Sequence, residues 1–473
     1  MKHKLGICIP YRNRKEHLER LVPHLGKYLT EKGIDHKFYV GHQVDDKLFN
    51  RGAMKNIAAE YAFNDGCDYI AWHDVDMLPY TNHHDTLPDY SYPEENPTHI
   101  ATKLSKYNYG LGYDQYFGGV ILFTKEQVER TNGYSNDYWD WGQEDDDLFW
   151  RCYYEGYATY RTIRKYNSKL YYEFDGETSK IEIPTNREIS SCLRNDHTIS
   201  VLFNASQQHD KVPIWLVGDP KKSFIEYPIL RKGGSANWGL SFNNSRAVTL
   251  TVFDINWGHY YNWAKRFEGM WTWLTVSYQK DSGLYYFYVN DELVTNVDDI
   301  KQNQPYMSTT NLRSHDASKP FILGHCESQN SYYKGKIAEV KIFDRFIPNV
   351  NDAIDGSDGL VLHTDFENRI NQCNDDKLII SNAKREIDDF EVIENVLPHR
   401  REGSFYCMHH EDEGFVNGTW KKGATTARNE RRFVTEMQQK KIDYKTDGMN
   451  SLKYNLVSTE MFMDNCLMIN VTL

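Results

Sequence analysis

The chain has 473 residues, of which 40% are hydrophobic and 26% charged, values ordinary for a soluble globular protein with two or three domains. A formal net charge of -12, without a basic stripe, argues against a nucleic-acid partner. The eight cysteines are scattered, and no apolar run reaches the roughly 18 residues that span a bilayer, so we expect reduced thiols, no integral membrane segment and a cytoplasmic location.

The first third of the chain alternates strand and helix patterns. Apolar runs typical of strands alternate with helical periodicity over residues 4–10, 15–33, 37–43, 54–66 and 68–76. Pro23 is expected to kink the first helix or to divide it in two. This β-α-β-α-β order predicts a mainly parallel sheet whose ligand crevice lies at the carboxyl ends of its strands.

The pattern changes near residue 170. Short runs rich in β-branched and aromatic residues follow, separated by Asp-Gly, Ser-Gly and Asn-Asp turn signals. They predict an antiparallel sandwich that ends near residues 370–400. The last stretch, 400–473, is mixed, with a helical pattern over 424–441.

Charged motifs stand at the predicted strand ends. "HDVDML" (73–78) places two carboxylates at i and i+2, and oxygen ligands suit Mg²⁺ or Mn²⁺ bound to a phosphate. A lone Asp-x-Asp is weak evidence, since any acidic loop supplies one. "PYRNR" (10–14) and "FNR" (49–51) supply Arg12, Arg14 and Arg51, which could hold a diphosphate or be solvated surface arginines.

A cluster of acidic residues follows two tryptophans in "YWDWGQEDDDLFWRC" (138–152). A carboxylate beside tryptophan and other carboxylates has a raised pKa, as a general base working near neutral pH requires. The same residues also fit an acidic first helical turn favoured by the helix dipole. The residues alone leave both interpretations open.

Five blocks of sequence resemble the β-1,4-galactosyltransferase family (glycosyltransferase family 7) in content and order. They are "GICIPYRNRKEHLERL", "LFNRGAMKN", "YIAWHDVDMLP", "DQYFGGVILFTKEQVERTNGYSNDYWDWGQEDDDLFWR" and "TDGMNSLKY". The resemblance covers about residues 4–165 and 400–460. It implies an α/β GT-A fold with a mainly parallel central sheet, a UDP-sugar donor, Mn²⁺ (or Mg²⁺) and inversion at the anomeric carbon.

The resemblance also implies residue roles. It assigns the UDP-sugar pocket to Pro10, Arg12, Arg14, Phe49, Arg51, Asp74, Val75, Gly119 and Trp141. It assigns the general base to Asp145, beside Glu144, and acceptor binding to Tyr116, Gly142 and Asp146. The metal would be bound by Asp76, His410 and Met408, with Cys407 as the alternative to Met408.

The donor and acceptor are less closely defined. Tyr116, in "QYFGG", resembles the tyrosine associated with galactose donors, so we expect UDP-galactose and a glycan acceptor. The alternatives are UDP-GalNAc, UDP-glucose or UDP-xylose, or a carbohydrate-binding protein with an inactive transferase half. Gln143 stands where many members have glycine, which could change the acceptor.

The domain limits follow from the same patterns. We expect residues 1–168 and 396–473 to form one GT-A domain, interrupted by an all-β insertion over 169–395. The insertion resembles a laminin-G or concanavalin-type jelly roll. It could bind carbohydrate, or serve as a scaffold and an oligomer contact.

Overall fold

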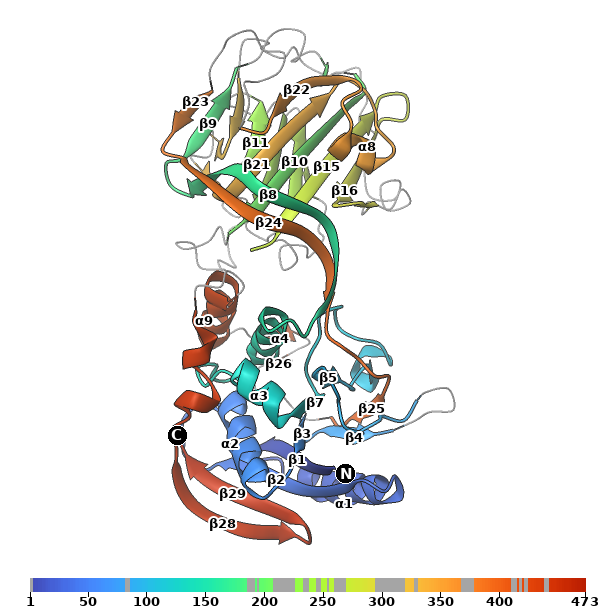
Figure 1. Ribbon diagram of the computed structural model, residues 1–473, viewed down its shortest axis with the longest axis vertical. Coiled ribbons are helices and arrows are strands. Elements are labelled where there is room, and N and C mark those ends of the chain that lie inside the picture. Colours follow the sequence, from blue (N-terminus) through green and yellow to red (C-terminus); the bar gives the residue numbers. More distant parts are fainter. Residues whose placement is uncertain are drawn as a thin grey trace. The chain divides into compact units, whose positions relative to one another are not determined.

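The computed structural model comprises two compact units, Met1–Tyr160 with Asn395–Leu473 (unit 1) and Arg161–Glu394 (unit 2) (Figure 1). It describes residues 3–80, 86–184, 192–193, 195–206, 226–232, 238–243, 248–252, 255–258, 269–293, 320–326, 331–366, 378–409, 415–416, 419–420, 424–437 and 442–473. The chain leaves unit 1 within β8 (Thr159–Asp175) and returns within β24 (Lys384–Leu397).

Unit 1 is built on a sheet of seven described strands in the order β28-β29-β2-β1-β3-β7-β5. The strands are β1 (Lys4–Tyr11), β2 (Asp35–Gln43), β3 (Tyr69–His73), β5 (Thr98–His99), β7 (Val120–Thr124), β28 (Asn455–Met463) and β29 (Cys466–Thr472). Parallel pairing is confined to the four neighbours β29, β2, β1 and β3. The flanking strands β28, β7 and β5 pair antiparallel.

Helices cover both faces of this sheet. On one face, α1 (Lys15–Glu31) packs leucines against Ile7, Ile9 and Val40. On the other face, α2 (Arg51–Asn64) lies so close to the strands that a Cβ on Gly41 would be 2.4 Å from the Met54 carbonyl oxygen. Glycine is therefore required where β2 meets α2, and this close packing fixes the position of the first turn of α2.

Pro23 lies inside α1, so of the two expected outcomes, a kink or a division, the division is wrong. Proline removes the hydrogen bond to the carbonyl of residue i-4, which is Glu19 here. Both Pro23 and Glu19 are exposed, so water can satisfy that carbonyl. The buried leucines on the opposite side keep the helix continuous.

Unit 1 has further helices and short strands outside this sheet. They are β4 (Met77–Pro79), β6 (Lys103–Leu104), η1 (Ser105–Tyr107), α3 (Lys125–Thr131), α4 (Glu144–Tyr154), β25 (Ser404–Cys407), β26 (Phe415–Val416), β27 (Thr419–Trp420), α9 (Ala424–Arg432), the π-helix η3 (Phe433–Met437), η4 (Tyr444–Thr446) and η5 (Met449–Ser451). A small sheet, β4-β25-β6, joins residues from before and after unit 2. The expected helix within 424–441 is confirmed by α9 and η3.

Unit 2 contains two larger sheets of described strands, β10-β21-β8-β24-β15-β16-β17 with β22, and β14-β13-β12-β11-β18-β9-β23. Its elements are β9 (Lys180–Ile183), β10 (His197–Ala205), β11 (Glu226–Lys232), β12 (Trp238–Asn243), β13 (Val248–Val252), β14 (Ile255–Gly258), β15 (Trp271–Gln279), β16 (Leu284–Val289), β17 (Glu292–Leu293), β18 (Phe321–Leu323), β19 (His325–Cys326), β20 (Ser331–Tyr332), β21 (Lys334–Phe343), α8 (Val350–Asp355), β22 (Leu360–Thr364) and β23 (Ile379–Ser381).

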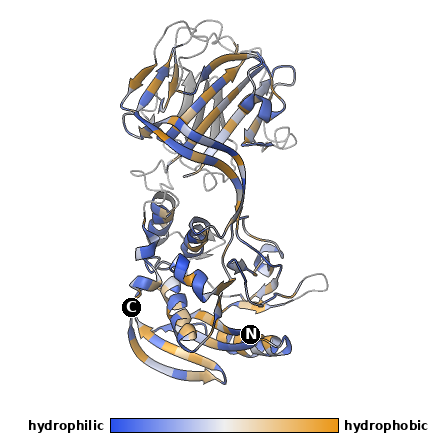
Figure 2. Ribbon diagram, in the orientation of Figure 1, coloured by the Kyte–Doolittle hydropathy of each residue, from blue (hydrophilic) through white to orange (hydrophobic). Residues whose placement is uncertain are grey.

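The two sheets of unit 2 share one hydrophobic core. Ile181 and Phe321 of one sheet pack with Val201, Val276 and Val340 of the other, and all are buried. Hydrophobic and hydrophilic residues alternate along these strands (Figure 2), as expected when one face of each sheet is buried. Unit 2 is thus a β-sandwich.

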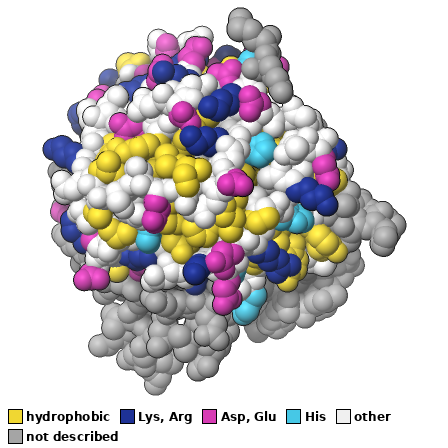
Figure 3. All heavy atoms as spheres, turned by 90° about the horizontal axis from the view of Figure 1, so that it is seen from below, with side chains coloured by type: hydrophobic (Ala, Val, Ile, Leu, Met, Phe, Trp, Pro, Cys, Tyr) yellow, Lys and Arg dark blue, Asp and Glu magenta, His cyan; other side chains and the backbone are white. Residues whose placement is uncertain are grey.

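The edge strand β28 of unit 1 carries exposed apolar side chains, including Leu456, Val457 and Met461. Figure 3 views the molecule from the side on which Figure 1 draws β28 and β29, and hydrophobic side chains gather across that face. Acidic and basic side chains are interspersed among them, as on an ordinary protein surface.

Candidate active site

Three chain segments leave the parallel strands of unit 1 at the same edge. Arg12 follows β1, Phe49 and Arg51 follow β2, and Asp74 follows β3. The guanidinium of Arg12 lies 5.1 Å from the centre of the Phe49 ring, and that of Arg51 lies 5.8 Å from it. The structure therefore brings Arg12, Phe49 and Arg51 together, as cation–π contacts about one ring.

Other predicted pocket residues lie nearby along the chain. Pro10 is a buried residue of β1, paired with Gly41 of β2, and Arg14 is the N-cap residue of α1. Val75 is half-buried between Asp74 and Asp76 and packs against the hydrophobic core of unit 1. These positions define the edge of the sheet from which the charged side chains extend.

The four consecutive carboxylates form the first turn of α4, and each has a different partner. Glu144 pairs with Arg51 at 2.6 Å, and Asp145 accepts a hydrogen bond from the Tyr134 hydroxyl at 2.9 Å. Asp146 accepts from the Tyr113 hydroxyl at 2.7 Å. Asp147 pairs with Arg151, four residues on, at 2.5 Å. A helix N-terminus favours carboxylates, and separate partners limit their mutual repulsion.

A buried lysine joins two of the acidic segments. Lys55 of α2 is fully buried, with its Nζ 3.1 Å from Asp74 Oδ1 and 3.5 Å from Asp145 Oδ1. The Tyr134 hydroxyl lies 3.1 Å from the same Nζ. The end of β3 and the start of α4 are thereby connected through one ammonium group.

The two carboxylates beside Lys55 have opposite pKa shifts. Burial raises the pKa of Asp145 to about 7, and the neighbouring Glu144 and Asp74 add to this against the opposing effect of Lys55. Burial would also raise the pKa of Asp74, but Lys55 and Arg51 outweigh it and lower that pKa. Asp74 is therefore an anion at neutral pH, whereas Asp145 can gain or lose a proton there.

Gly118 makes room beside Asp145, and its neighbour Gly119 bonds to the Asp74 backbone. A Cβ on Gly118 would lie 2.6 Å from Asp145 Oδ2 and 2.9 Å from the Tyr116 hydroxyl oxygen. Gly119 has a φ of +85°, and its carbonyl accepts a hydrogen bond from the Asp74 backbone nitrogen at 2.9 Å. The tract that contains Tyr116, Gly118 and Gly119 is therefore in contact with both acidic segments.

The loop before α4 has an unusual backbone. Gly142 and Gln143 have positive φ angles of 105° and 73°. Trp141 is 43% exposed, and its carbonyl lies 3.4 Å from Asn429 Nδ2 of α9. Gln143 thus holds a left-handed conformation that glycine adopts more readily.

The predicted metal ligands are only partly described. The Met408 backbone nitrogen donates to the Asp76 carbonyl at 2.8 Å, so Met408 and Asp76 are neighbours although unit 2 separates them in sequence. Cys407 Sγ instead lies 3.5 Å from Met77 Sδ. His410 lies outside the described residues. Within the described ranges, no group of three His, Cys, Asp or Glu residues could by itself hold a metal ion.

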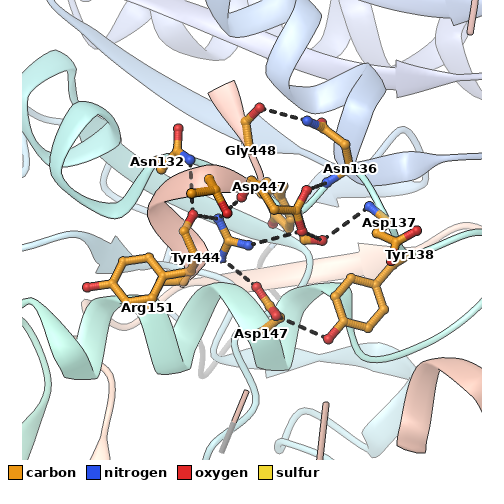
Figure 4. Close-up of polar contacts among 12 residues, drawn as sticks. Asn132, Asn136, Asp137, Tyr138, Asp147, Arg151, Tyr444, Asp447 and Gly448 are labelled. Carbon is orange, nitrogen blue, oxygen red and sulfur yellow. Dashed lines mark hydrogen bonds and ion pairs between the residues drawn. The ribbon is translucent and has the colours of Figure 1, made fainter. Parts of the chain in front are cut away.

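The C-terminal segment is held against α4 by buried charges (Figure 4). Arg151 donates to Asp147 and to the carbonyls of Gly133 and Asp447, at 2.5, 3.1 and 2.6 Å. Asp447 also pairs with Arg432 at 2.8 Å, and its Oδ1 accepts from the Asn136 backbone nitrogen at 3.0 Å. This network secures the helix that carries Glu144, Asp145 and Asp146.

Sequence analysis missed three charged or polar residues of the site: Lys55, Lys106 and Tyr134. Lys106 lies over the Tyr116 ring at 5.8 Å. Burial would lower its pKa, but Tyr107, Asp76, Cys407 and Asp74 raise it. A lysine inside the apolar pattern of 54–66, four residues after Arg51, was the available signal for Lys55.

Two family profiles match the N-terminal part of the chain. Residues 1–86 match the N-terminal region of glycosyl transferase group 7, and residues 98–173 match a domain described as the N-terminal domain of galactosyltransferase. Together these matches cover β1 to β8 and include both acidic segments. His410 and the rest of the C-terminal part of unit 1 lie outside them.

Curated relatives match the same part. Mouse β-1,4-galactosyltransferase 7 is 39% identical over 159 residues, which are 34% of this chain and 46% of the relative. Human β-1,4-galactosyltransferase 1 is 38% identical over 161 residues (34% and 39%), and the Drosophila melanogaster β-1,4-galactosyltransferase 7 is 43% identical over 152 residues (32% and 44%). The chain thus spans less than half the length of these relatives.

A solved structure is also similar to this chain. It is the catalytic domain of Drosophila β-1,4-galactosyltransferase 7 in complex with xylobiose, 38% identical, with a TM-score of 0.29, covering 33% of this chain and 62% of that one. A mutant of the same Drosophila enzyme, in complex with manganese, UDP-Gal and xylobiose, is 36% identical over the same shares, also with a TM-score of 0.29.

The expected cytoplasmic location is wrong. The relatives are β-1,4-galactosyltransferases, which are Golgi-lumenal type II membrane enzymes. The prediction relied on scattered cysteines and on the lack of an apolar run long enough to span a bilayer, and neither feature identifies a compartment. None of the helices in the described ranges combines the length and apolar character needed to cross a bilayer.

The matched residues carry the arginines, the Asp-x-Asp motif and the acidic start of α4. Through residues 1–86 and 98–173, the chain is similar to the β-1,4-galactosyltransferase family.

Proposed function

We propose that unit 1 transfers galactose from UDP-galactose to a hydroxyl group of a glycan acceptor, with inversion at the anomeric carbon. The observation that carries the proposal is the position of Asp145. Its pKa is about 7, and it shares Lys55 with Asp74 of the Asp-x-Asp motif. A proton acceptor for a sugar hydroxyl therefore lies beside the segment expected to hold the nucleotide sugar.

The donor would bind over the ends of β1, β2 and β3. Arg12 and Arg51, gathered about Phe49, offer guanidinium groups of the kind that bind a diphosphate in bidentate fashion. We assign Pro10, Arg14, Val75, Asp74, Gly119 and Trp141 to the same pocket by family resemblance. Lys106, near Asp74 and Asp76, adds a cation on the side of the leaving group.

A divalent cation fits the chemistry of this site. Asp76 offers a carboxylate and Met408, its backbone neighbour, a thioether, while His410 is the third ligand implied by the family. Cys407 is the weaker candidate because its sulfur lies beside Met77. The resemblance implies Mn²⁺, with Mg²⁺ as the alternative. Such an ion stabilises the charge that develops on a departing diphosphate.

Asp145 would act as the general base. The acceptor hydroxyl gives its proton to Asp145 as its oxygen bonds to the anomeric carbon, and the bond from that carbon to the UDP oxygen breaks. Attack from the face opposite UDP inverts the configuration. UDP leaves as an anion, so no general acid is needed, and Arg12, Arg51 and Lys106 supply compensating positive charge.

The acceptor would lie between the start of α4 and the tract that contains Tyr116. Glu144 and Asp146 offer carboxylates for sugar hydroxyls, Gly142 provides backbone freedom, and Trp141 is exposed enough to cover a sugar ring. Tyr116 favours galactose as the donor sugar by family resemblance. UDP-GalNAc, UDP-glucose or UDP-xylose would use the same machinery.

For unit 2 we propose a laminin-G or concanavalin-like jelly roll, inserted at about residues 169–395 into a GT-A domain formed by 1–168 and 396–473. Its two sheets around one core support this reading. It would bind carbohydrate, or act as a scaffold and oligomer contact.

A carbohydrate-binding protein with an inactive transferase half is the second candidate function.

The test is a donor and acceptor screen with the full chain. UDP-galactose, UDP-GalNAc, UDP-glucose and UDP-xylose are each offered with xylose, glucose and N-acetylglucosamine glycosides, in Mn²⁺ and in EDTA. We expect galactose transfer that needs the metal. Saccharide binding without transfer or UDP-galactose hydrolysis under any condition would favour the carbohydrate-binding alternative.

A further inference from the structure

We infer that Lys55 is a positioning residue for the transfer reaction: it holds the Asp145 carboxylate in place and ties it to the donor-side carboxylate Asp74. The inference rests on the proposed function. It concerns a residue that lies on α2, away from the acidic start of α4 and from the Asp-x-Asp motif in the sequence.

The first support is the completeness of its contacts. An ammonium group has three N–H donors, and Lys55 Nζ has three acceptors within reach. They are Asp74 Oδ1 at 3.1 Å, the Tyr134 hydroxyl at 3.1 Å and Asp145 Oδ1 at 3.5 Å. The Nζ also lies 4.7 Å from the centre of the Tyr134 ring. The contacts with Tyr134 and Asp145 are hydrogen bonds and the contact with Asp74 is an ion pair, so the ammonium group contacts polar groups from three segments of the site.

The second support is the cost of placing a lysine there. Lys55 is fully buried among the apolar residues of α2, including Met54, Ile57 and Ala58. Moving an ammonium ion out of water is unfavourable, and an apolar residue of similar size often stabilises such a position better. Packing alone would therefore favour an apolar residue, so the buried charge points to a role in the site.

The third support is that the two carboxylate oxygens of Asp145 have different contacts. Oδ1 receives Lys55 and the Tyr134 hydroxyl, which fix the orientation of the carboxylate. Oδ2 faces Gly118, where even a single methyl group would come within 2.6 Å. Among the residues that the structure describes, no hydrogen bond reaches Oδ2. That oxygen is the one available to take the acceptor proton.

The charges around Asp145 determine what loss of Lys55 would do. Arg51 and Lys55 come from α2, Glu144 from α4 and Asp74 from the end of β3. The Tyr134 and Tyr116 hydroxyls face it from the loops on either side of β7 and α3. Without Lys55, Arg51 would remain as the cation acting on all three carboxylates, with Lys106 acting on Asp74, so Asp145 would hold its proton to higher pH.

The experiment compares Lys55→Met, Lys55→Gln and Lys55→Arg in the full chain, with UDP-galactose, Mn²⁺ and the acceptor found in the screen. Both uncharged variants should lower kcat at pH 7 by about 10²-fold, the lower range for loss of a working general base. The acidic limb of their kcat profile should move up by about one pH unit or more. Lys55→Arg should keep the wild-type limb because it keeps the charge.

Two controls separate this role from a general loss of structure. Lys341→Met removes another buried, paired lysine, which lies 3.5 Å from Glu339 in unit 2, and should leave the pH profile unchanged. In an Asp145→Asn background, Lys55→Met should cause no further loss of kcat, because the residue on which Lys55 acts is already neutral.

Several results would overturn the inference. The first is an acidic limb that stays at its wild-type pH in both uncharged variants. The second is an equal loss of kcat when Lys55→Met is made in the wild-type and in the Asp145→Asn background. The third is failure of both uncharged variants to fold and bind UDP, which would assign Lys55 a structural role. If the wild-type chain transfers no sugar, the proposed function fails and this inference fails with it. If the wild-type chain is active but the acidic limb does not move in Lys55→Met and Lys55→Gln, this inference is wrong and the proposed function stands.

Discussion

The four carboxylates that begin α4 have different environments although they are adjacent in sequence. Asp147 is buried against Arg151 and serves structure, while Glu144 is paired with Arg51. Asp145 alone combines a pKa near 7 with an oxygen that faces Gly118. The partners of each carboxylate therefore determine whether it stabilises the fold or can take part in the reaction.

The pKa of Asp145 predicts a pH dependence. The folded-state pKa is about 7, and the base works only when deprotonated, so the transfer rate should fall as pH drops below 7. Well below that pKa, the rate should drop about tenfold per pH unit. A pH profile of kcat/KM between pH 5 and 9, which reports the pKa values of the free enzyme, checks this, and a flat profile from pH 5 upward would contradict it.

Gly118→Ala should impair catalysis more than folding. The new methyl carbon would lie 2.6 Å from Asp145 Oδ2, so the carboxylate must move. A displacement on the order of 1 Å can cost about 10²-fold in rate. We expect kcat to fall by about that factor with little change in Tm. Gly26→Ala, whose φ is not positive and whose Cβ would lie 3.6 Å from its nearest neighbour, Phe38, controls for the substitution itself.

At the scale of elements, local pattern predicted the N-terminal strands and helices because their burial follows simple periodicity. It could not predict that β29, from the end of the chain, pairs with β2, or that β25 pairs with β4. Lys55 was missed for the same reason, since Asp74, Tyr134 and Asp145 are distant in sequence. The pairing of remote segments depends on tertiary packing, and a short stretch of sequence carries no information about it.

The anchoring of α4 gives a stability prediction. Arg151→Leu leaves Asp147 buried without its 2.5 Å partner and frees the carbonyls of Gly133 and Asp447. Breaking a buried ion pair in this way costs about 3–5 kcal/mol. We expect that loss in chemical denaturation of unit 1.

The control is Lys15→Ala, which removes another pair spaced i and i+4, but an exposed one, with Glu19 at 3.7 Å. Exposed pairs contribute about 0.5 kcal/mol or less. Equal losses of stability in Arg151→Leu and Lys15→Ala would show that burial of the Asp147–Arg151 pair carries no special weight.

At the scale of the whole molecule, the chain leaves and re-enters unit 1 at neighbouring points. The Thr159 hydroxyl donates to the Leu397 carbonyl at 3.1 Å. Each unit has its own hydrophobic core. Insertion of one compact unit between adjacent positions of another is a tolerated arrangement.

Removal of unit 2 should therefore leave unit 1 folded. We expect a chain in which 161–394 is replaced by a short Gly/Ser linker to keep its thermal transition and its transfer to a small acceptor glycoside, within about threefold, since the ends already meet. Circular dichroism and the transfer assay measure this. An insoluble or inactive product would show that unit 1 depends on unit 2.

The most direct measurement of the central claim uses Asp145→Asn. This change keeps the size of the side chain but removes the base, so galactose transfer by the full chain with Mn²⁺ should fall by about 10³-fold, within the range for general base catalysis. UDP binding, measured by calorimetry, should stay close to wild type. Turnover near the wild-type rate in this variant would contradict the account.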